Sequence, residues 1–523
     1  MGIVDAGPIL LALMLGVLLA AIVAWFVAGL YQRRMVALMR AGPAPDERHV
    51  VGEPPAVAAP SRPPPMLDAK ANRRQMGRQL LAWSLLCLII GLTHSWLALR
   101  FVYTGDGFSA TRLLVLGLVY AWPMVMAWGL LRRWHWGRVV LGVGVYMVAM
   151  AGVVMLASDD DQTLAGVAAW LGGVVAIPVV ITLLIGASGR IRAVAPYLLP
   201  VFVLLAASSV YALNVLAGAV EYEPDWLAVL LGTLGVWGTL LLVVLAPWLV
   251  LAWPLYALAR WLAGAYRRKR FSDLGYLFAA YWLVILVASA LPGLQSVGAA
   301  SLTQLLPWLW IPLAAVVLRG WLVPPGSPPP TLLVLRVFQQ DARVQALFDR
   351  VVERWRLSGN TVLIAGTDLV SRTLDPDDLF AFINGRLESR FIADEAGLDE
   401  RLRGFDFDPD PDGRYRVNEC YCFDSTWQAA LAALVREADV VLMDLRGFQP
   451  SNLGCRHELA VLSGADHLRR VVLLHDAHTA RTVAEADTAG APAGRFVWIE
   501  AGRLDRARSG QVLRALFGAP DTS

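Results

Sequence analysis

Charged side chains follow an apolar run in the second half of the chain, within the sequence ADVVLMDLRGFQPSNLGCRHEL (438–459). Val440–Met443 is short, apolar and rich in β-branched residues, which predicts a buried parallel strand. Asp444 and Arg446 come directly after this run. Because ligands bind at the carboxyl ends of the strands in an open α/β sheet, we expect both side chains to line a ligand-binding crevice.

A predicted helix start brings a second group of polar residues to the same crevice. Pro450–Asn452 supply turn and N-cap chemistry, so a helix should begin at the next residue. The free backbone amides near Ser451 and Gly454 can bind a phosphate group, with Arg446 as its cation. Glu458 lies one to two turns into this helix on the side of Gly454 and Cys455, so we expect its side chain to overhang the crevice. The alternative for Glu458 is a solvated helix position.

The last part of the chain alternates between short apolar runs and helical patterns. Five apolar strands with intervening helices predict an α/β domain with a five-stranded, parallel, doubly wound sheet. Asp341 and Asp368 follow the first two strands, so we expect them at the same edge of the sheet as Asp444. Residues 392–425 are expected to form an irregular acidic insertion, with Asp406–Asp412 as a solvated turn. The predicted strands are Leu332–Phe338, Thr361–Ala365, Val440–Met443, Arg470–Leu474 and Phe496–Ile499.

Other polar clusters in this region are expected to be structural. Cys420, Cys422, Cys455 and His457 do not have the spacing of zinc-binding motifs, so no metal site is predicted. A cytosolic location also disfavours disulfide bonds. His475, Asp476 and His478 follow the fourth strand and could line the crevice, but we expect their side chains to belong to an exposed polar loop.

The whole chain is too apolar for an ordinary soluble protein, because 57% of its 523 residues are hydrophobic and the mean hydropathy is +0.55. Residues 1–325 carry 22 Lys and Arg against 13 Asp and Glu, whereas residues 326–523 carry 23 against 29. The acidic second part argues against nucleic acid as a partner, since binding nucleic acid needs a basic face. The apolar first part predicts a lipid bilayer as a partner.

Nine apolar runs long enough to cross a bilayer occupy the first part of the chain. Basic loops alternate with acidic or neutral ones, which predicts a multi-pass cell-membrane protein with its N-terminus outside and its C-terminal domain in the cytoplasm. Pro247 and Pro254 are expected to kink or divide the long run 226–259. The predicted parts are an N-terminal transmembrane anchor (1–40), a Pro-rich cytoplasmic linker (41–78), a membrane domain of about eight helices (79–323), a Pro-rich linker (324–330) and a cytoplasmic α/β domain (331–523).

The centres of the predicted spans contain no Asp, Glu, Lys or Arg. Ion-coupled carriers usually keep such residues inside their spans. His94 and Asn214 are the polar exceptions, and we expect each to make interhelical hydrogen bonds. The membrane domain is therefore expected to anchor or to sense rather than to drive coupled transport.

The segment 438–459 resembles the third strand and following helix of TIR domains. Their Ser-x-x-Cys-x-x-Glu-Leu pattern is approximated by Ser451, Cys455, Glu458 and Leu459. The same segment is equally similar to the Gly-x-x-x-Glu-Leu segment of nucleoside 2-deoxyribosyltransferases, with Gly454 in the matching place. The stretch VFQQDARVQALFDRVVERW (337–355) also resembles the first strand and helix of TIR domains, and TDLVSRTLDP (367–376) resembles the loop after their second strand.

This resemblance implies a flavodoxin-like, TIR-like sheet and cleavage of the N-glycosidic bond of NAD or a related nucleotide, in signalling or defence. Glu458 would act at C1′ of the ribose, and NAD would be a substrate rather than a cofactor. Self-association of the cytoplasmic domain is a further implied property. The alternative is a non-catalytic nucleotide-binding or protein-assembly module, tethered to a membrane sensor or a channel-like bundle.

Overall fold

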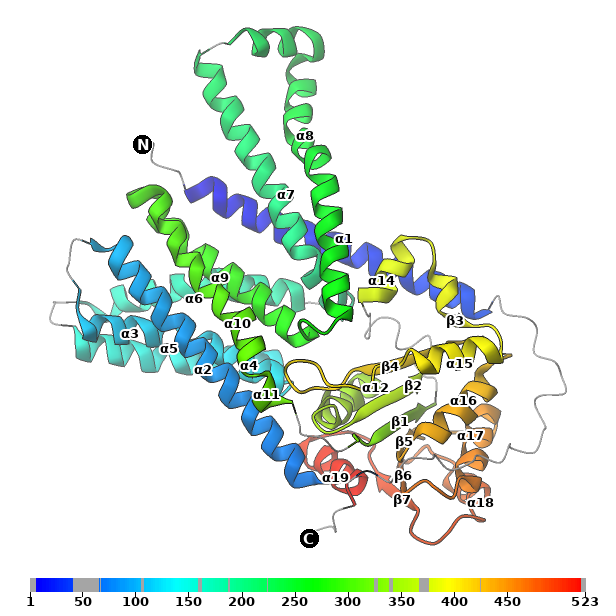
Figure 1. Cartoon of the computed structure of the whole chain (residues 1–523). Helices are drawn as coiled ribbons and strands as arrows, with labels where there is room; N and C mark the ends of the chain where they lie inside the picture. The colour runs from blue at the N-terminus through cyan, green and yellow to red at the C-terminus, as the bar shows by residue number, and fades with distance from the viewer. Residues whose placement is uncertain are drawn as a thin grey trace. The chain divides into compact units, whose positions relative to one another are not determined.

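The computed structural model describes residues 6–40, 65, 67–104, 108–158, 162–186, 189–222, 224–323, 328–337, 342–365, 376–423 and 425–518. The chain divides into two compact units (Figure 1). The first comprises Met1–Gly29 and Leu80–Leu318, and the second comprises Leu30–Gln79 and Arg319–Ser523. The first unit is helical, and the second contains the sheet.

Nine helical segments within the described residues are long and apolar enough to cross a membrane, which fits a multi-pass membrane protein. They coincide with the nine apolar runs of the sequence. The segments are α1 (Ala6–Arg40), α2 (Ala69–Phe101), α3 with α4 (Ala110–Tyr120 and Pro123–Leu131), α5 (Trp136–Ala157), α6 (Leu164–Gly186), α7 (Gly189–Tyr222), α8 (Asp225–Arg267), α9 (Asp273–Val297), and the 3₁₀ helix η3 (Gly298–Leu309) with α10 (Trp310–Val317).

Helix α8 is divided at a glycine rather than at a proline. Gly235 has φ 66° and ψ 179°, which lies outside the helical region, whereas Pro247 and Pro254 both lie inside the helix. Neither proline therefore divides the helix, and a kink at these prolines stays a prediction. Only glycine adopts such a backbone without steric cost, and this explains why the break occurs at Gly235.

The polar exception His94 joins two helices of the first unit. It is buried, and its Nδ1 lies 3.3 Å from the carbonyl oxygen of Gln304 in η3. Gln304 in turn donates a hydrogen bond to Ser301 Oγ at 3.0 Å. His94 thus makes the interhelical contact expected for an isolated polar residue in a bundle. The side chain of Asn214 lies outside the described residues.

The second unit contains a parallel sheet of seven strands in the order β3-β4-β2-β1-β5-β6-β7. The predicted number of five is wrong, because residues 392–425 contribute to two further strands. Their sequences hide them: one has only two residues, and the other reads VNECYC without an apolar run. The strands are β1 (Thr331–Arg336), β2 (Asn360–Ile364), β3 (Phe391–Ile392), β4 (Val417–Cys422), β5 (Val440–Asp444), β6 (Arg470–His475) and β7 (Phe496–Glu500).

Helices cover both faces of this sheet (Figure 1). On one face, Leu333 and Val441 pack in one core with Leu434 of α16 and Leu459 of α17. On the other, Trp355 of α13 stacks on Phe517, just after α19, with ring centroids 5.1 Å apart. The remaining elements are α11 (Arg319–Leu322), α12 (Ala342–Leu347), the π-helical turn η4 (Phe348–Val352), α13 (Glu353–Trp355), α14 (Pro376–Ile383), η5 (Leu387–Arg390), α15 (Glu395–Arg403), α16 (Trp427–Glu437), α17 (Leu453–Gly464), α18 (Arg481–Asp487) and α19 (Arg506–Leu516).

The acidic loop before β4 is buried at Asp410 and Asp412, so the expected solvated turn is wrong for these two residues. Asp410 is 0% exposed, and Arg416 Nε and Nη2 donate hydrogen bonds to Asp410 Oδ1 at 3.0 and 2.7 Å. Asp412 is also buried, and its Oδ1 accepts a hydrogen bond from the Arg414 backbone amide at 3.1 Å. A run of aspartates is predicted to be a solvated turn unless the cation that pairs with it is recognised. Here that cation is Arg416, six residues after Asp410.

Replacing Asp410 with Asn should destabilise the second unit by about 3 kcal/mol, because removing one member of a buried ion pair leaves the other charge uncompensated. Asp408→Asn, at an exposed site in the same loop, is the matched control and should cost less than about 0.5 kcal/mol. Calorimetric unfolding of the full-length protein in detergent measures both. Equal stabilities of the two variants would contradict a structural role for the Asp410–Arg416 pair.

Candidate functional site

The central strands β1 and β5 flank the point where the ligand-binding crevice is expected. The chain leaves β1 for β2 on one side, and later returns to place β5 on the other side, so strand order reverses between them. Such a switch point opens a crevice at the carboxyl ends of the strands. Arg336 and Asp444 are partners in the β1–β5 register and end the two strands. The candidate site is therefore built around them.

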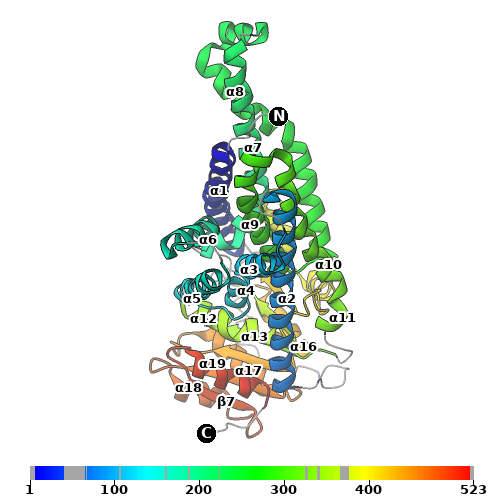
Figure 2. The same ribbon diagram turned by 90° about the vertical axis from the view of Figure 1, so that its left-hand side faces the viewer.

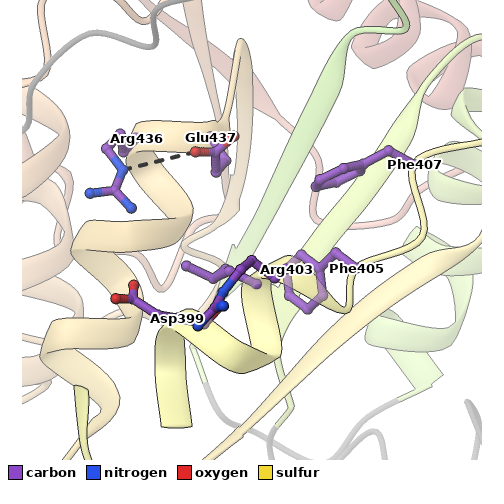
Figure 3. A pocket seen from close by; sticks show the side chains of 7 residues that line it. Asp399, Arg403, Phe405, Phe407, Arg436 and Glu437 are labelled. Atoms are coloured by element: carbon purple, nitrogen blue, oxygen red, sulfur yellow. Dashed lines mark hydrogen bonds and ion pairs between the residues drawn. The ribbon is translucent and has the colours of Figure 1, made fainter. Parts of the chain in front are cut away.

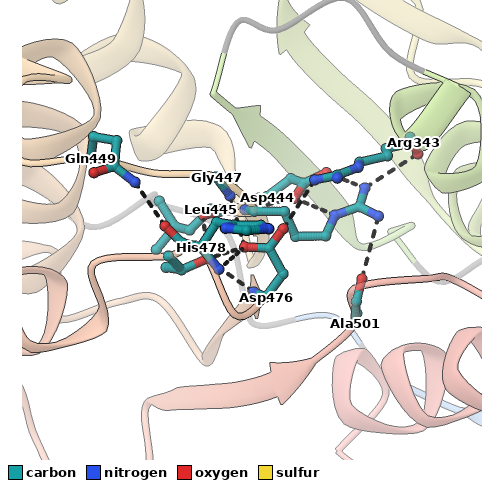
Figure 4. A network of polar contacts seen from close by, with 10 residues as sticks. Arg343, Asp444, Leu445, Gly447, Gln449, Asp476, His478 and Ala501 are labelled. Atoms are coloured by element: carbon teal, nitrogen blue, oxygen red, sulfur yellow. Dashed lines mark hydrogen bonds and ion pairs between the residues drawn. The ribbon is translucent and has the colours of Figure 1, made fainter.

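Asp444 and Arg446 form a buried ion pair at this edge (Figure 4). Arg446 donates its backbone N–H and its Nε–H to Asp444 Oδ1 at 3.1 and 2.8 Å, and its Nη2–H to Asp444 Oδ2. Its guanidinium also donates to the carbonyl oxygens of Arg343 and Ala501 at 3.2 and 3.4 Å. Most of its donors are thus used within the protein, and Arg446 joins β5 to α12 and to the loop after β7.

Asp476, just after β6, holds the neighbouring loops. Its Oδ1 accepts hydrogen bonds from the backbone amides of Gly447 and His478 and from Thr479 Oγ1, at 3.0 to 3.1 Å, and its Oδ2 accepts one from Arg343 Nη1 at 3.0 Å (Figure 4). Burial favours the neutral acid, but these hydrogen bonds and the Arg343 charge outweigh it and lower the Asp476 pKa. The expectation of an exposed loop is wrong for Asp476, which is buried.

Glu458 lies in the second turn of α17 and is 4% exposed, so the alternative of a solvated helix position is wrong. Its Oε2 has no hydrogen-bond partner within the described part of the chain. Burial raises the pKa of the Glu458 carboxyl to about 8, and the charge of Arg336 opposes this rise. At neutral pH the carboxyl group is therefore mostly protonated. A buried polar group without a partner costs about 1–3 kcal/mol.

Arg336 was not predicted from the sequence as a site residue. It ends the central strand β1, is 2% exposed, and donates a hydrogen bond to the Ile364 carbonyl oxygen at 3.4 Å. An arginine that closes the otherwise apolar run TLLVLR is the signal that could have indicated it. A buried guanidinium needs acidic or carbonyl partners, so its presence in a central strand points to a polar crevice.

The other predicted residues divide into two groups. Ser451 and Gly454 are exposed at the start of α17, which begins at Leu453 as predicted. Asp341 and Asp368 lie outside the described residues. The structure thus brings Asp444 and Arg446 together and buries the carboxyl group of Glu458 near Arg336.

The cysteine thiols near the crevice are poor nucleophiles. Cys420, Cys422 and Cys455 are all buried, and burial raises the pKa of each, to about 12 for Cys420. Within the residues that the structure describes, no group of three or more His, Cys, Asp or Glu side chains is placed to hold a metal ion.

A cavity of about 380 Å³ lies elsewhere in the second unit, between α15 and the carboxyl end of α16 (Figure 3). Phe405 and Phe407 supply apolar walls, and Asp399 and Arg403 of α15 supply charges. The end of α16 leads into the amino end of β5, so this cavity lies at the opposite edge of the sheet from the crevice. It contains none of the predicted site residues.

Comparison with protein-family models, curated proteins and solved structures gave no match for this chain. The function must therefore be argued from the crevice and from the resemblance of its sequence segments.

The pH dependence of stability should change when Glu458 is replaced with Gln. The folded-state pKa of about 8 lies above the ordinary 4.5, so the folded protein holds this proton more tightly than the unfolded chain does. The stabilisation of the folded state by this bound proton is complete below pH 4.5, and it is lost as the pH rises through about 8. Between these values the wild type should lose stability relative to Glu458→Gln by up to about 1.4 kcal/mol per pH unit.

Denaturant unfolding of the full-length protein in detergent across this pH range measures the difference. The exposed Glu485→Gln on α18 is the matched control and should track the wild type at every pH. A constant difference between wild type and Glu458→Gln would show that the carboxyl group is not held neutral in the folded state.

Proposed function

We propose that the α/β unit cleaves the N-glycosidic bond of a nucleotide, with NAD as the first candidate, and that Glu458 acts at C1′ of the ribose. The observation that carries this proposal is the buried Glu458 carboxyl group, whose Oε2 has no hydrogen-bond partner among the residues that the structure describes and whose pKa the charge of Arg336 lowers against the effect of burial. A buried carboxyl group without a hydrogen-bond partner lowers the stability of the fold. Carboxyl groups with strongly shifted pKa values are concentrated at functional sites, where such a cost is offset by activity.

The strand order supports the resemblance to flavodoxin-like, TIR-like sheets. Strands β2, β1, β5, β6 and β7 lie side by side in that order, which corresponds to the order 2-1-3-4-5 of a five-stranded flavodoxin-like sheet. The strands β4 and β3 extend the sheet beyond β2. In this arrangement the crevice lies between the first and third strands of the five, where Arg336 and Asp444 end.

The proposed reaction needs one carboxylate. The bond between C1′ and the nicotinamide nitrogen breaks, and its electron pair neutralises the positive charge of the ring, so the leaving group needs no acid. The oxygen of a water molecule then bonds to C1′, and its proton passes to Glu458 or to solvent. ADP-ribose, nicotinamide and a proton are the products. The Glu458 carboxylate stabilises the oxocarbenium-like centre between these steps.

The phosphates of the substrate would bind at the start of α17. Ser451 and Gly454 are exposed there, and the first amides of the helix can donate to an anion. Arg446, whose guanidinium donates mainly to Asp444 and to backbone carbonyls, would act chiefly by its charge. Asp341 and Asp368 stay predictions for nucleotide contacts.

A second candidate is a non-catalytic nucleotide-binding or protein-assembly module. The observation that favours it is the burial of Glu458, since a neutral carboxyl group can serve simply as a polar member of the core. In that case the membrane unit, as a sensor or channel-like bundle, carries the activity. The two candidate functions differ in one observable: only the first predicts that the protein releases nicotinamide from NAD.

We further propose that the protein is a multi-pass cell-membrane protein with its N-terminus outside and the α/β unit in the cytoplasm. The alternation of basic and acidic loops supports this orientation. A cytoplasmic nucleotide would then be within reach of the crevice, and neighbouring copies could self-associate through their α/β units.

Glu458→Gln should abolish nucleotide cleavage by the full-length protein in lipid nanodiscs. Gln keeps the size of the side chain but removes the negative charge, so the rate should fall by about 10²-fold or more. Glu458→Asp should lose about 10²-fold as well, because it withdraws the carboxylate by roughly 1 Å. The wild-type kcat/KM should rise with pH, reach half of its maximum near pH 8 and level off only above that value, since the carboxylate is the active form.

Release of nicotinamide from NAD, measured by chromatography, provides the rates, and Glu485→Gln should match the wild type. Equal cleavage by wild type and Glu458→Gln would remove Glu458 from the reaction. No cleavage by any variant, even at high protein density, would leave the binding-module candidate.

The orientation is tested by cysteine labelling in intact cells. A cysteine at Glu221, exposed at the end of α7, should react with a membrane-impermeant maleimide. A cysteine at Arg268, exposed after α8, should react only after the cells are permeabilised. The four native cysteines are buried and should contribute little background. Reaction of Arg268→Cys in intact cells would overturn the proposed topology.

A further inference from the structure

The first turns of α2 carry a row of buried amide side chains. Asn72, Gln75 and Gln79 are three and four residues apart, so they lie on one face of the helix. All three are buried, and all belong to the second unit. From Leu80 onward the same helix belongs to the first unit and provides one of the candidate membrane spans. Figure 2 shows α2 as one uninterrupted helix.

The amide face is hydrogen-bonded to the backbone of the second unit at three separate places. Asn72 Nδ2 donates to the Arg354 carbonyl oxygen at 2.7 Å and to Ser358 Oγ at 2.8 Å. Gln79 Nε2 donates to the Asp412 carbonyl oxygen at 2.8 Å, and Gln75 Nε2 donates to that of Leu322. Because the bonds go mainly to backbone carbonyls, the helix is attached to the chain itself rather than to mobile side chains.

Besides Leu322 at the end of α11, two segments receive these bonds, and both lead directly into strands. The first is the end of α13 and the turn before β2, and the second is the loop 406–416 before β4. Ion pairs lock the two segments together, since Glu353 pairs with both Arg356 and Arg414. Arg356 Nε also donates to the Tyr415 carbonyl oxygen at 2.6 Å. A displacement of one segment is therefore shared by the other.

One glycine makes this close attachment possible. Gly413 has φ 78°, and a Cβ at this position would overlap the Leu322 carbonyl oxygen and the Gln75 amide. Any other residue would be strained by the backbone and would separate the loop from α2. The loop, α2 and the end of α11 are thus packed so closely at Gly413 that no side chain fits between them.

We propose that α2 is the link through which a rotation or shift of a membrane span alters the α/β unit. Its amide face acts as a clamp on the amino ends of β2 and β4, and the helix contains no proline at which a rotation could be lost. Helix shifts of this kind are a common way for packed proteins to change state. The proposal concerns regulation and does not depend on which reaction the crevice performs.

Insertions after Gln79 test whether the two parts of α2 are in phase. One alanine turns the amide face by about 100° relative to the span, whereas four alanines turn it by about 400° and nearly restore the phase. Hydrogen exchange of the full-length protein in nanodiscs reports on the clamp. We expect the amides of 406–416 to exchange roughly tenfold faster in the one-alanine protein and near the wild-type rate in the four-alanine protein. Strand β6 (Arg470–His475) should be unchanged in both.

A substitution provides a second measurement if an insertion prevents folding. Gln79→Leu removes the bond to Asp412, so 406–416 should exchange faster than in the wild type. A change in bilayer thickness should alter exchange in this segment of the wild type and have less effect in Gln79→Leu. Arg74→Leu, on the exposed side of the same turns, is the matched control and should behave as the wild type. Wild-type exchange in both insertion proteins, or an equal response to thickness in Gln79→Leu, would overturn the proposal.

Discussion

The Asp444–Arg446 pair is the interaction on which the crevice depends. Taking two charges out of water costs several kcal/mol each, and their attraction repays this only when geometry and additional hydrogen bonds are good. Here the carboxylate accepts three hydrogen bonds from one residue, and the remaining guanidinium donors reach carbonyl oxygens after β1 and after β7. The pair therefore holds three parts of the chain together at the carboxyl edge of the sheet. Replacing either residue with an uncharged one would leave the other charge buried without a partner.

Asp476 and Glu458, the two other acids considered for the site, have pKa values that are shifted in opposite directions. Asp476 has a lowered pKa because four donors surround it, whereas burial near a single cation leaves Glu458 with a raised pKa. Divergent pKa shifts among the acids of one site are typical where one acid is structural and another exchanges a proton. This contrast, rather than the mere presence of Glu458, supports a chemical role for that residue.

Apolar strands are visible in the sequence because burial on both faces demands continuous apolar runs. Strands β1, β2, β5, β6 and β7 meet this demand, but β3 has two residues and β4 interleaves Asn418 and Glu419 with its apolar positions, so both were missed. At the site, Asp444 and Arg446 could be placed because they follow a recognisable strand directly. Asp476 also follows a recognisable strand, but its distant partner Arg343 could not be seen in the sequence. Arg336 was missed, since its importance lies in partners that are brought close only by the sheet.

The start of α2 was also predicted incorrectly, because the partners of its polar side chains are distant in sequence. Its first turns are polar, so composition assigns them to a cytoplasmic linker ending at residue 78, yet the structure carries the helix back to Ala69. Amides are uncharged and strongly hydrogen-bonding, which makes them costly in lipid but well suited to bonding a carbonyl that would otherwise be buried without a partner. Three of them at helical spacing, directly before an apolar run, indicate a helix whose first turns enter a protein interior. Polarity at the end of a span thus signals docking when it follows the helical period, and a solvated linker when it does not.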